Sequence, residues 1–445
     1  MSTPQARIAC GAGFAADRTA PAVDLVERGG LDAIALECLG ERTVALAALR
    51  RLTDPAGGFD PMLGKRMRAL LEPLHRTGTR LVTNAGAADP VGAARMVRAL
   101  GAELGTPTTV AAVTGDDVLD RIDRTAPAWE DGLPLEAHGE LVSANAYIGV
   151  DALLPALETP ASVVVAGRAA DPSLFLAPLV HTLGWDTADW TRMAAGTLVG
   201  HLLECAGQVT GGYFADPARK PVPGLADLGY PLAEVGADGT AVVTKLPGTG
   251  GRVDRMTVVE QLTYEVTDPR GYLTPDVTLD MGAVTVTDTG GDRVAVRGAR
   301  GRPRPPDLKV SVGYRAGFRG EGEIGYAGAG ALARARLAAE VVRERLSGVL
   351  DRLRVDLVGH SALHGEALAA GAEPYECRLR VAGLAADRAT AEAVGEEVSA
   401  LYTAGPAGGG GLRTATEEVI GVLSTTIPRE RVETGVVVLE GGAGR

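Results

Sequence analysis

The chain has 445 residues, more than one hydrophobic core usually organises, so we expect two domains. Its net charge of -12 argues against nucleic acid as a partner, because phosphate binding needs a clustered basic surface. The sequence has neither a signal-peptide pattern nor a run of about 18 apolar residues, so we expect a cytoplasmic protein without a membrane partner.

Strand-like runs alternate with helix-like segments through the first half of the chain. Each run is short and apolar and ends in turn residues, as buried parallel strands do. The runs cover residues 7–10, 31–38, 79–84, 108–113, 141–143 and 163–166. This alternation predicts an α/β fold with a parallel, mostly doubly wound sheet that helices cover on both faces. Because five or six units fall short of the eight in a closed barrel, a partial or distorted α/β barrel is the alternative.

A glycine turn follows the first strand. Gly11 and Gly13 begin a dinucleotide-binding pattern, but Ala16 or Asp17 stands where the third glycine would be. A carboxylate there would repel a pyrophosphate, so we expect no dinucleotide cofactor.

Polar side chains stand at the carboxyl ends of several predicted strands. They are Asn84, Asn145, Arg168 and Asp171. Ligands of open α/β sheets bind outside these strand ends, so the four side chains are candidates for one binding crevice. In the alternative interpretation the two asparagines cap helices, and Arg168 and Asp171 form an ion pair that orients a loop.

The predicted helix over residues 196–209 carries a polar stripe among apolar neighbours. His201, Glu204, Cys205 and Gln208 stand at i, i+3, i+4 and i+7, which places them on one helix face. A buried polar stripe needs partners or a ligand, because each unpaired buried group costs about 1–3 kcal/mol. The stripe therefore either lines a site or bonds neighbouring strand ends and holds the helix in register.

The chemistry of this stripe admits two further readings. His201, Glu204 and Cys205 would suit zinc, manganese or iron, but the helical HExxH pattern and a second ligand pair are missing, so we predict no metal site. Cys205 has His201 one turn away as a base for nucleophilic attack, although a buried thiol usually acts as a small apolar side chain. Cys10, Cys38 and Cys377 lack CxxC spacing, and we expect all four thiols to be reduced.

The sequence pattern changes after Tyr230, where apolar and polar residues alternate around an Asp238-Gly239 hairpin signal. Lys245 follows directly before a glycine turn. Residues 288–306 are rich in Arg, Gly and Pro, as exposed connections are, although such an Arg cluster also suits an acidic ligand such as a coenzyme A phosphate.

We therefore predict an α/β domain over residues 1–287 that carries the candidate site, a connection over residues 288–306, and a smaller α+β domain over residues 307–445. In the last domain the glycine run 408–411 is either an anion-binding loop or a flexible one.

Several sequence blocks occur in the order of a known family. They are SANAYIG (143–149), AGRAADPSL (166–174), AGTLVGHLLECAGQVTGGYFAD (195–216), KLPGTGG (245–251), TYEVTDPRGYLTPDV (263–277), GFRGEGEIGYAGAGALARARLAAE (317–340) and TAGPAGGGG (403–411). On these blocks the chain resembles the acyclic terpene utilisation protein A family over residues 6–435. The resemblance implies a soluble enzyme, or a subunit of one, that handles branched acyl chains as coenzyme A thioesters or acids. It supplies no catalytic residues.

The sequence thus predicts an enzyme of lyase or hydratase type that uses acid–base chemistry beside the carbonyl of a branched-chain acyl thioester or carboxylic acid. Candidate catalytic residues are His201, Glu204, Asp171 and Arg168; candidate substrate-binding residues are Asn84, Asn145, Tyr147, Gln208 and Lys245. We expect no cofactor beyond coenzyme A as part of the substrate, and a homo-oligomer, with a dimer as the simplest form. The alternative is a non-catalytic subunit that binds acyl ligands or bridges other enzymes.

Overall fold

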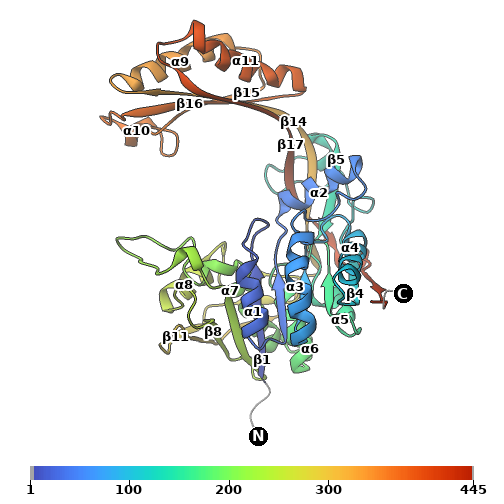
Figure 1. Cartoon of the computed structure of the whole chain (residues 1–445). Helices are drawn as coiled ribbons and strands as arrows, with labels where there is room; N and C mark the ends of the chain where they lie inside the picture. The colour runs from blue at the N-terminus through green and yellow to red at the C-terminus, as the bar shows by residue number, and fades with distance from the viewer. Residues whose placement is uncertain (1–4, 443–445) are drawn as a thin grey trace. The chain divides into compact units, whose positions relative to one another are not determined.

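The computed structural model describes residues 5–442. They divide into two compact units, drawn in Figure 1. The first unit contains residues up to 135, residues 141–313 and the segment from residue 422 onward. The second contains residues 136–140 and 314–421. The chain therefore leaves the first unit and returns to it.

A ten-stranded sheet forms the centre of the first unit. Five neighbouring strands run parallel in the order β1 (Gln5–Ala12), β2 (Ala33–Leu36), β3 (Arg80–Thr83), β6 (Val163–Val165) and β4 (Val110–Thr114). Antiparallel strands extend the sheet beyond β1: β7 (Pro231–Gly236), β8 (Ala241–Lys245), β12 (Val294–Arg297) and β11 (Thr285–Asp288). Beyond β4 lies one further antiparallel strand, β18 (Gly435–Leu439).

The mixed α/β class expected from the sequence is confirmed, but a mostly parallel sheet is not. Among the described residues, four neighbouring strand pairs of this sheet are parallel and five are antiparallel. The reason is that the alternating segments after Tyr230 form hairpins, and hairpin strands are antiparallel. They continue the parallel sheet instead of forming a structure of their own.

Helices pack in two layers, and the direction of the crossovers explains why. Connections between parallel strands are right-handed, so helices that link β1, β2, β3 and β4 in one direction share a face, and the return from β4 to β6 uses the other face. The first layer contains α1 (Ala20–Arg28), α3 (Leu63–Thr77) and α4 (Pro90–Glu103), which contact one another in that order. The second contains α5 (Val150–Leu157), α6 (Ser173–Leu183) and α7 (Trp190–Leu203). Outside the layers lie α2 (Glu41–Thr53) and α8 (Arg255–Thr263).

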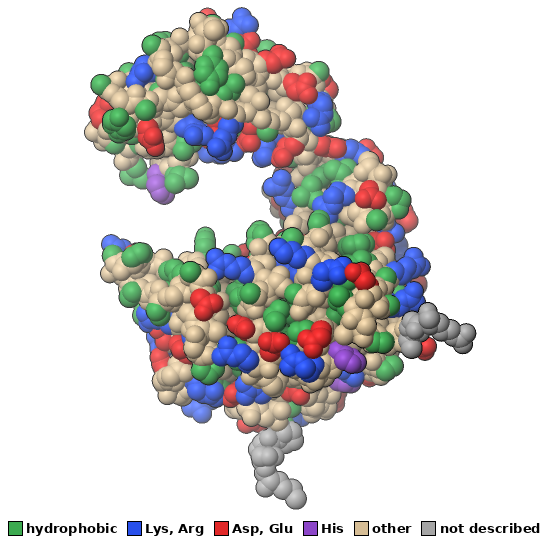
Figure 2. All heavy atoms as spheres, in the orientation of Figure 1, with side chains coloured by type: hydrophobic (Ala, Val, Ile, Leu, Met, Phe, Trp, Pro, Cys, Tyr) green, Lys and Arg blue, Asp and Glu red, His purple; other side chains and the backbone are tan. Residues whose placement is uncertain are grey.

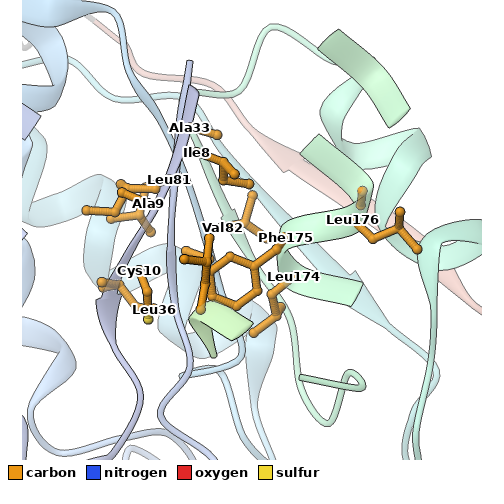
Figure 3. Packing of buried hydrophobic residues seen from close by; sticks show 14 of the residues in the cluster. Ile8, Ala9, Cys10, Ala33, Leu36, Leu81, Val82, Leu174, Phe175 and Leu176 are labelled. Atoms are coloured by element: carbon orange, nitrogen blue, oxygen red, sulfur yellow. The ribbon is translucent and has the colours of Figure 1, made fainter. Parts of the chain in front are cut away.

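The main hydrophobic core lies between the sheet and these helices. Val82 of β3 lies beside Phe175 of α6 in Figure 3, and Ile8 and Leu36 of the central strands belong to the same core cluster. All four side chains are inaccessible to solvent or nearly so. Valine, isoleucine and leucine in short runs suit strands that are buried on both faces. This rigid core fixes where the strand ends lie.

The order of the parallel strands creates a topological switch point between β3 and β6. The chain leaves β3 toward α4 and leaves β6 toward α6, which belong to different helix layers. Connections that diverge from neighbouring strands leave a crevice at their carboxyl ends, where ligands of open α/β sheets bind. Asn84 follows β3 and Arg168 follows β6 at this point.

Smaller elements complete the first unit. A three-stranded sheet contains β9 (Tyr272–Leu273), β10 (Thr278–Asp280) and β13 (Arg300–Arg302). The strand β5 (Leu141–Ala146) pairs with the long β14 (Asp307–Ala327). The visible face of the unit carries acidic and basic side chains interspersed (Figure 2).

The second unit is an antiparallel sheet with helices. Its elements follow in the order β14, α9 (Ala331–Arg345), β15 (Arg352–Val358), α10 (Glu366–Ala369), β16 (Glu376–Ala385), α11 (Arg388–Ala404) and β17 (Gly410–Pro428). The strand order is β15-β16-β14-β17. Ile324, Leu379 and Val398 belong to a separate hydrophobic core between the sheet and its two long helices.

The unit boundaries differ from those expected at residues 1–287, 288–306 and 307–445. The stretch 288–306 contains β12 and β13 and belongs to the first unit, since β12 pairs with β8. Its Arg and Gly content reflects exposed hairpin strands. Residues 422–442 also belong to the first unit, because β18 pairs with β4.

None of the helices in the described part of the chain has the length and apolar content that a membrane span requires.

Candidate functional site

The loop after β2 brings a buried glutamate to the carboxyl edge of the sheet. The side chain of Asn84, from the end of β3, donates to Glu37 Oε1 at 2.9 Å and accepts from the Cys38 amide at 2.8 Å. The amide of Leu39 also donates to Glu37 Oε1, at 2.9 Å. Asn84 therefore joins two neighbouring strand ends and holds the Glu37 carboxyl in place.

Arg168 enters the same edge from the end of β6, with its side chain only 2% exposed. Its guanidinium donates to the Leu39 carbonyl oxygen and lies 3.1 Å from Asp171 Oδ1 and 4.0 Å from Glu37 Oε1. Its carbon Cζ stacks 4.1 Å from the ring centroid of Tyr147. Burial disfavours the charged guanidinium, but the facing Asp171, Tyr147 and Glu37 raise the pKa of Arg168 above its usual range. Arg168 is thus a buried permanent cation.

Asn145 lies behind Arg168. Its side chain donates to Asp116 Oδ2 at 2.9 Å, and the Arg168 amide donates to the same oxygen at 2.8 Å. Burial raises the pKa of Asp116 to about 6. Asn145 therefore supports the loop that carries Arg168.

Tyr147, whose ring stacks on Arg168, also has polar partners at its hydroxyl group. Its hydroxyl donates to Glu41, and Lys309 lies 3.1 Å from that carboxylate and 4.7 Å from the centroid of the ring. Burial opposes ionisation of Glu41, but Arg168 and the Tyr147 hydroxyl lower its pKa to about 2. Glu41 is therefore ionised at neutral pH.

The end of α7 supplies a buried histidine and glutamate. His201 Nδ1 lies 3.0 Å from Glu204 Oε1, and Nε2 lies 3.3 Å from the Leu262 carbonyl oxygen. Burial raises the pKa of Glu204 to about 7, although His201 opposes the shift. Burial disfavours charged His201, but its contacts with Glu204 and Leu262 raise its pKa above the usual range. The second oxygen, Glu204 Oε2, is buried without a hydrogen-bond partner.

The predicted helix is shorter than residues 196–209. The helix α7 ends at Leu203, because Ala206 has a positive φ of 43° that a continuing helix does not allow. Gln208 therefore leaves the stripe and lies in a short 3₁₀ turn, where it hydrogen-bonds the Tyr264 side chain. Burial raises the pKa of the Cys205 thiol, which keeps it protonated.

The end of α7 packs against the end of β1. A Cβ atom on Gly13, just after β1, would lie 2.6 Å from the Ala206 nitrogen, so only glycine fits this approach. The carboxyls after β2 and β6 and at the end of α7 also influence one another's pKa values. Burial and the charge of Asp171 raise the pKa of Glu37 to about 8, and Asp171 also contributes to the raised pKa of Glu204. Asp171 thus acts on the pKa values of both Glu37 and Glu204.

We call this group of side chains the carboxyl cluster. It contains Glu37, Asp171 and Glu204 together with Arg168 and His201. Of the predicted substrate-binding residues, Lys245 is not part of it. Its ammonium contacts the Thr249 carbonyl oxygen at 2.9 Å and Asp292 at 3.2 Å, in the turns after β8 and β11.

Sequence comparison identifies the family of the chain. The family model of the acyclic terpene utilisation family protein AtuA matches residues 6–438. The chain belongs to this family. No curated protein and no solved structure matches it. The resemblance that the sequence blocks indicated is therefore confirmed over nearly the whole chain.

Sequence reasoning missed two groups at the site of this AtuA-family chain. Glu37 ends an apolar strand-like run, and a lone carboxylate in that position was a usable signal. Tyr272 gave no signal, because it follows a loop far along the chain. Its ring centroid lies 5.3 Å from that of His201, and burial raises its pKa, as do Glu204 and Asp171.

Within residues 5–442 no three His, Cys, Asp or Glu side chains are arranged to hold a metal ion. The site of this AtuA-family chain contains a buried cation, two carboxyls whose pKa values lie near neutral pH, and an acidic side chain, Asp171, that is 32% exposed.

Proposed function

We propose that the chain is an enzyme of the lyase or hydratase type that moves protons beside the carbonyl of a branched-chain acyl thioester or carboxylic acid. One observation carries this proposal. Two buried carboxyls, Glu37 and Glu204, stand at the carboxyl edge of the sheet near its switch point, with pKa values of about 8 and 7. Groups that exchange protons in catalysis work best when their pKa lies near the working pH.

The two carboxyls have different roles in this proposal. Glu37 is protonated at pH 7, which suits a proton donor. Glu204 is partly ionised at pH 7, and its buried Oε2, which has no hydrogen-bond partner in the protein, is the oxygen that would take a proton from a substrate carbon. His201 holds the other oxygen of Glu204 and orients it. Asp171 extends the cluster toward solvent, and Arg168 compensates its charge.

Family membership supports the substrate class. Acyclic terpenes are branched chains, and a family for their utilisation suits an enzyme of branched acyl compounds. In this proposal the predicted substrate-binding residues act indirectly. Asn84 positions Glu37, while Asn145 and Tyr147 position Arg168.

Deuterium exchange tests the proposal without knowledge of the natural product. Branched acyl thioesters and their free acids are incubated with the protein in D₂O, and mass spectrometry follows deuterium at the carbon beside the carbonyl, together with any added water or cleaved chain. We expect exchange or turnover with the wild type and a loss of about 10²-fold or more in Glu204→Gln, because a positioned base contributes that much.

The control is Glu158→Gln, which changes an exposed carboxylate at the end of α5 and should leave the rate unchanged. Glu37→Gln should keep the fold and lose turnover. Ligand binding by the wild type with no exchange or turnover of any compound would contradict the enzyme and favour a non-catalytic acyl-binding subunit.

A further inference from the structure

Arg66 of α3 is buried beside the loops that follow β1 and β2. Its side chain is 2% exposed and pairs at 2.8 Å with Asp60, whose side chain is 4% exposed. A buried ion pair loses hydration on both sides, and it is stable only when further hydrogen bonds complete it. The other N–H donors of Arg66 therefore decide whether it does more than balance Asp60.

Those donors fasten the turn after β1, residues 13–17, which we call the β1 loop. The terminal nitrogen Nη2 of Arg66 donates to the carbonyl oxygens of Ala15 at 2.7 Å and Phe14 at 3.2 Å, and it lies 3.4 Å from that of Asp17. Within the described residues, only the Nε atom of this guanidinium is buried without an acceptor. One side chain thus ties three carbonyl groups of a short loop to α3.

The β1 loop packs against the backbone that carries Glu204. A Cβ atom on Gly13 would lie 2.3 Å from the Glu204 carbonyl oxygen, so the two backbones are in direct contact. The Gly13 amide donates to Asp17 Oδ2 at 2.8 Å, which closes the loop on itself. A shift of the loop would therefore move or release the end of α7.

Arg66 also contacts the segment that carries Glu37. Its Nη1, which pairs with Asp60, donates to Cys38 Sγ at 3.1 Å, and Cys38 directly follows Glu37. The Glu37 amide donates to the Ala12 carbonyl oxygen at 2.8 Å, at the end of β1. The same guanidinium thus contacts both the β1 loop and the segment after β2.

We propose that Arg66 is a positioning residue of the carboxyl cluster: it holds the β1 loop against the backbone of Glu204 and holds Cys38 beside Glu37, and so it fixes the spacing of the two carboxyls. The inference rests on the proposed function in that Glu37 and Glu204 are taken as the proton-transfer groups. Arg66 acts through the loop and not on the substrate. Turnover is sensitive to such positioning, because a misplacement of about 1 Å costs as much as 10²-fold in rate.

A double variant tests the inference. Arg66→Met alone would leave the Asp60 charge buried without a partner, so Arg66→Met is combined with Asp60→Asn, which removes both charges together. We expect this variant to fold and to lose about tenfold or more in kcat in the deuterium-exchange assay. KM should change little, because the variant alters the reacting groups and not the binding of the substrate chain.

Two single variants are the controls. Asp60→Asn breaks the same ion pair but keeps the bonds from Arg66 to the β1 loop, so it should lower the midpoint of urea denaturation and keep most of its kcat. Arg68→Met changes a 55% exposed arginine of the same helix and should alter neither readout. A purely structural role of Arg66 would instead make kcat follow the urea midpoint in all of these variants.

Hydrogen exchange measures the β1 loop without any turnover. Mass spectrometry of peptides that cover residues 11–19 should show faster amide exchange in the double variant than in the wild type or Asp60→Asn, because the loop has lost its anchor. Peptides from residues 314–421 belong to the second unit and should exchange alike in all proteins.

The outcomes distinguish this inference from the proposed function. A double variant with the kcat of the wild type, an equal loss of kcat in Asp60→Asn, or unaltered exchange of the β1 loop overturns the inference. A wild type that turns over none of the compounds, together with faster exchange of the β1 loop in the double variant alone, overturns the acid–base function and supports Arg66 as the anchor of this loop.

Discussion

Arg168 is the buried cation around which the carboxyl cluster is arranged. It faces Asp171, Glu37 and the Leu39 carbonyl oxygen with a side chain that solvent hardly reaches. Removing one partner of such a pair is costly, because the other charge stays buried without compensation. The same cation compensates the charges of Asp171 and Glu37.

Arg168→Met should therefore lower the free energy of unfolding by about 3–5 kcal/mol. Urea denaturation followed by circular dichroism measures the change. The control Arg98→Met replaces an exposed arginine of α4 and should change stability by less than about 0.5 kcal/mol. Similar small effects for both variants would show that Arg168 does not compensate the cluster.

Glu37 should make stability depend on pH in an unusual direction. Burial raises its pKa in the folded chain to about 8, against an ordinary value of 4.5. The folded state therefore binds more protons than the unfolded state between these values, so the contribution of Glu37 is present below about pH 4.5 and is lost as the pH rises toward 8. Glu204, with a pKa raised to about 7, acts in the same direction.

We expect Glu37→Gln to flatten the decline of the free energy of unfolding between pH 5 and 8, because glutamine does not titrate. Urea titrations at several pH values give the two slopes. An identical slope in wild type and variant would mean that Glu37 ionises at its ordinary pKa in the folded chain.

At the scale of elements, the sequence predicted the strands that local patterns determine. The runs ending at Asn84 and before Arg168 are short and apolar because both faces are buried, and both became β-strands of the parallel region. The polar residues after them do meet at one edge, as parallel order requires. The prediction was sound where a strand end alone decides the position of a side chain.

The prediction failed where the position of a side chain depends on distant parts of the chain. Lys245 stands beside a glycine turn in the sequence, but Asp292 of a later hairpin pairs with it. Tyr272 reaches His201 only through the fold. The helix α7 ends at Leu203, and Gly13 packs closely against the backbone that follows, which no helix periodicity reveals.

Gly13→Ala tests this contact between β1 and the end of α7. The added methyl group would lie 2.6 Å from the Ala206 nitrogen, so the backbone that carries Glu204 must move. We expect a loss of about 1–3 kcal/mol in the free energy of unfolding and a marked fall in turnover.

Gly64→Ala is the matched control inside a helix. The nearest atom to its Cβ lies 3.8 Å away, and α3 surrounds it. This variant should gain up to about 1 kcal/mol, because alanine favours helix more than glycine does. A Gly13→Ala variant as stable and active as wild type would exclude the close contact.

At the scale of the whole molecule, the first unit is assembled from separate stretches of chain. Residues 314–421 form a unit with its own core, and the chain then returns to add β18 beside β4. Val436 and Leu439 of this strand pack against the main core. A strand at the margin of the sheet thus contributes both pairing and apolar burial.

Ending the chain at Val432 should lower the midpoint of urea denaturation, with a loss of about 2 kcal/mol or more from the burial of these two side chains. It should also raise light scattering on storage, because the bare edge of β4 is open to pairing with other chains. Replacing Val437 and Val438, which are 40% and 38% exposed, by threonine is the control and should change neither readout much. A truncated chain that stays as stable and as clear as the full one would show that β18 is dispensable.

The return of the chain to β4 also bears on how the molecule is made. A ribosome releases the residues of β4 more than 300 positions before those of β18. Until then the nascent first unit carries an unpaired strand edge, while the inserted unit, which consists of residues 136–140 and 314–421, is complete earlier. Synthesis in the cell should therefore pass through a stage in which the second unit is folded and the first still needs protection from aggregation, so chaperone dependence should be confined to the first unit.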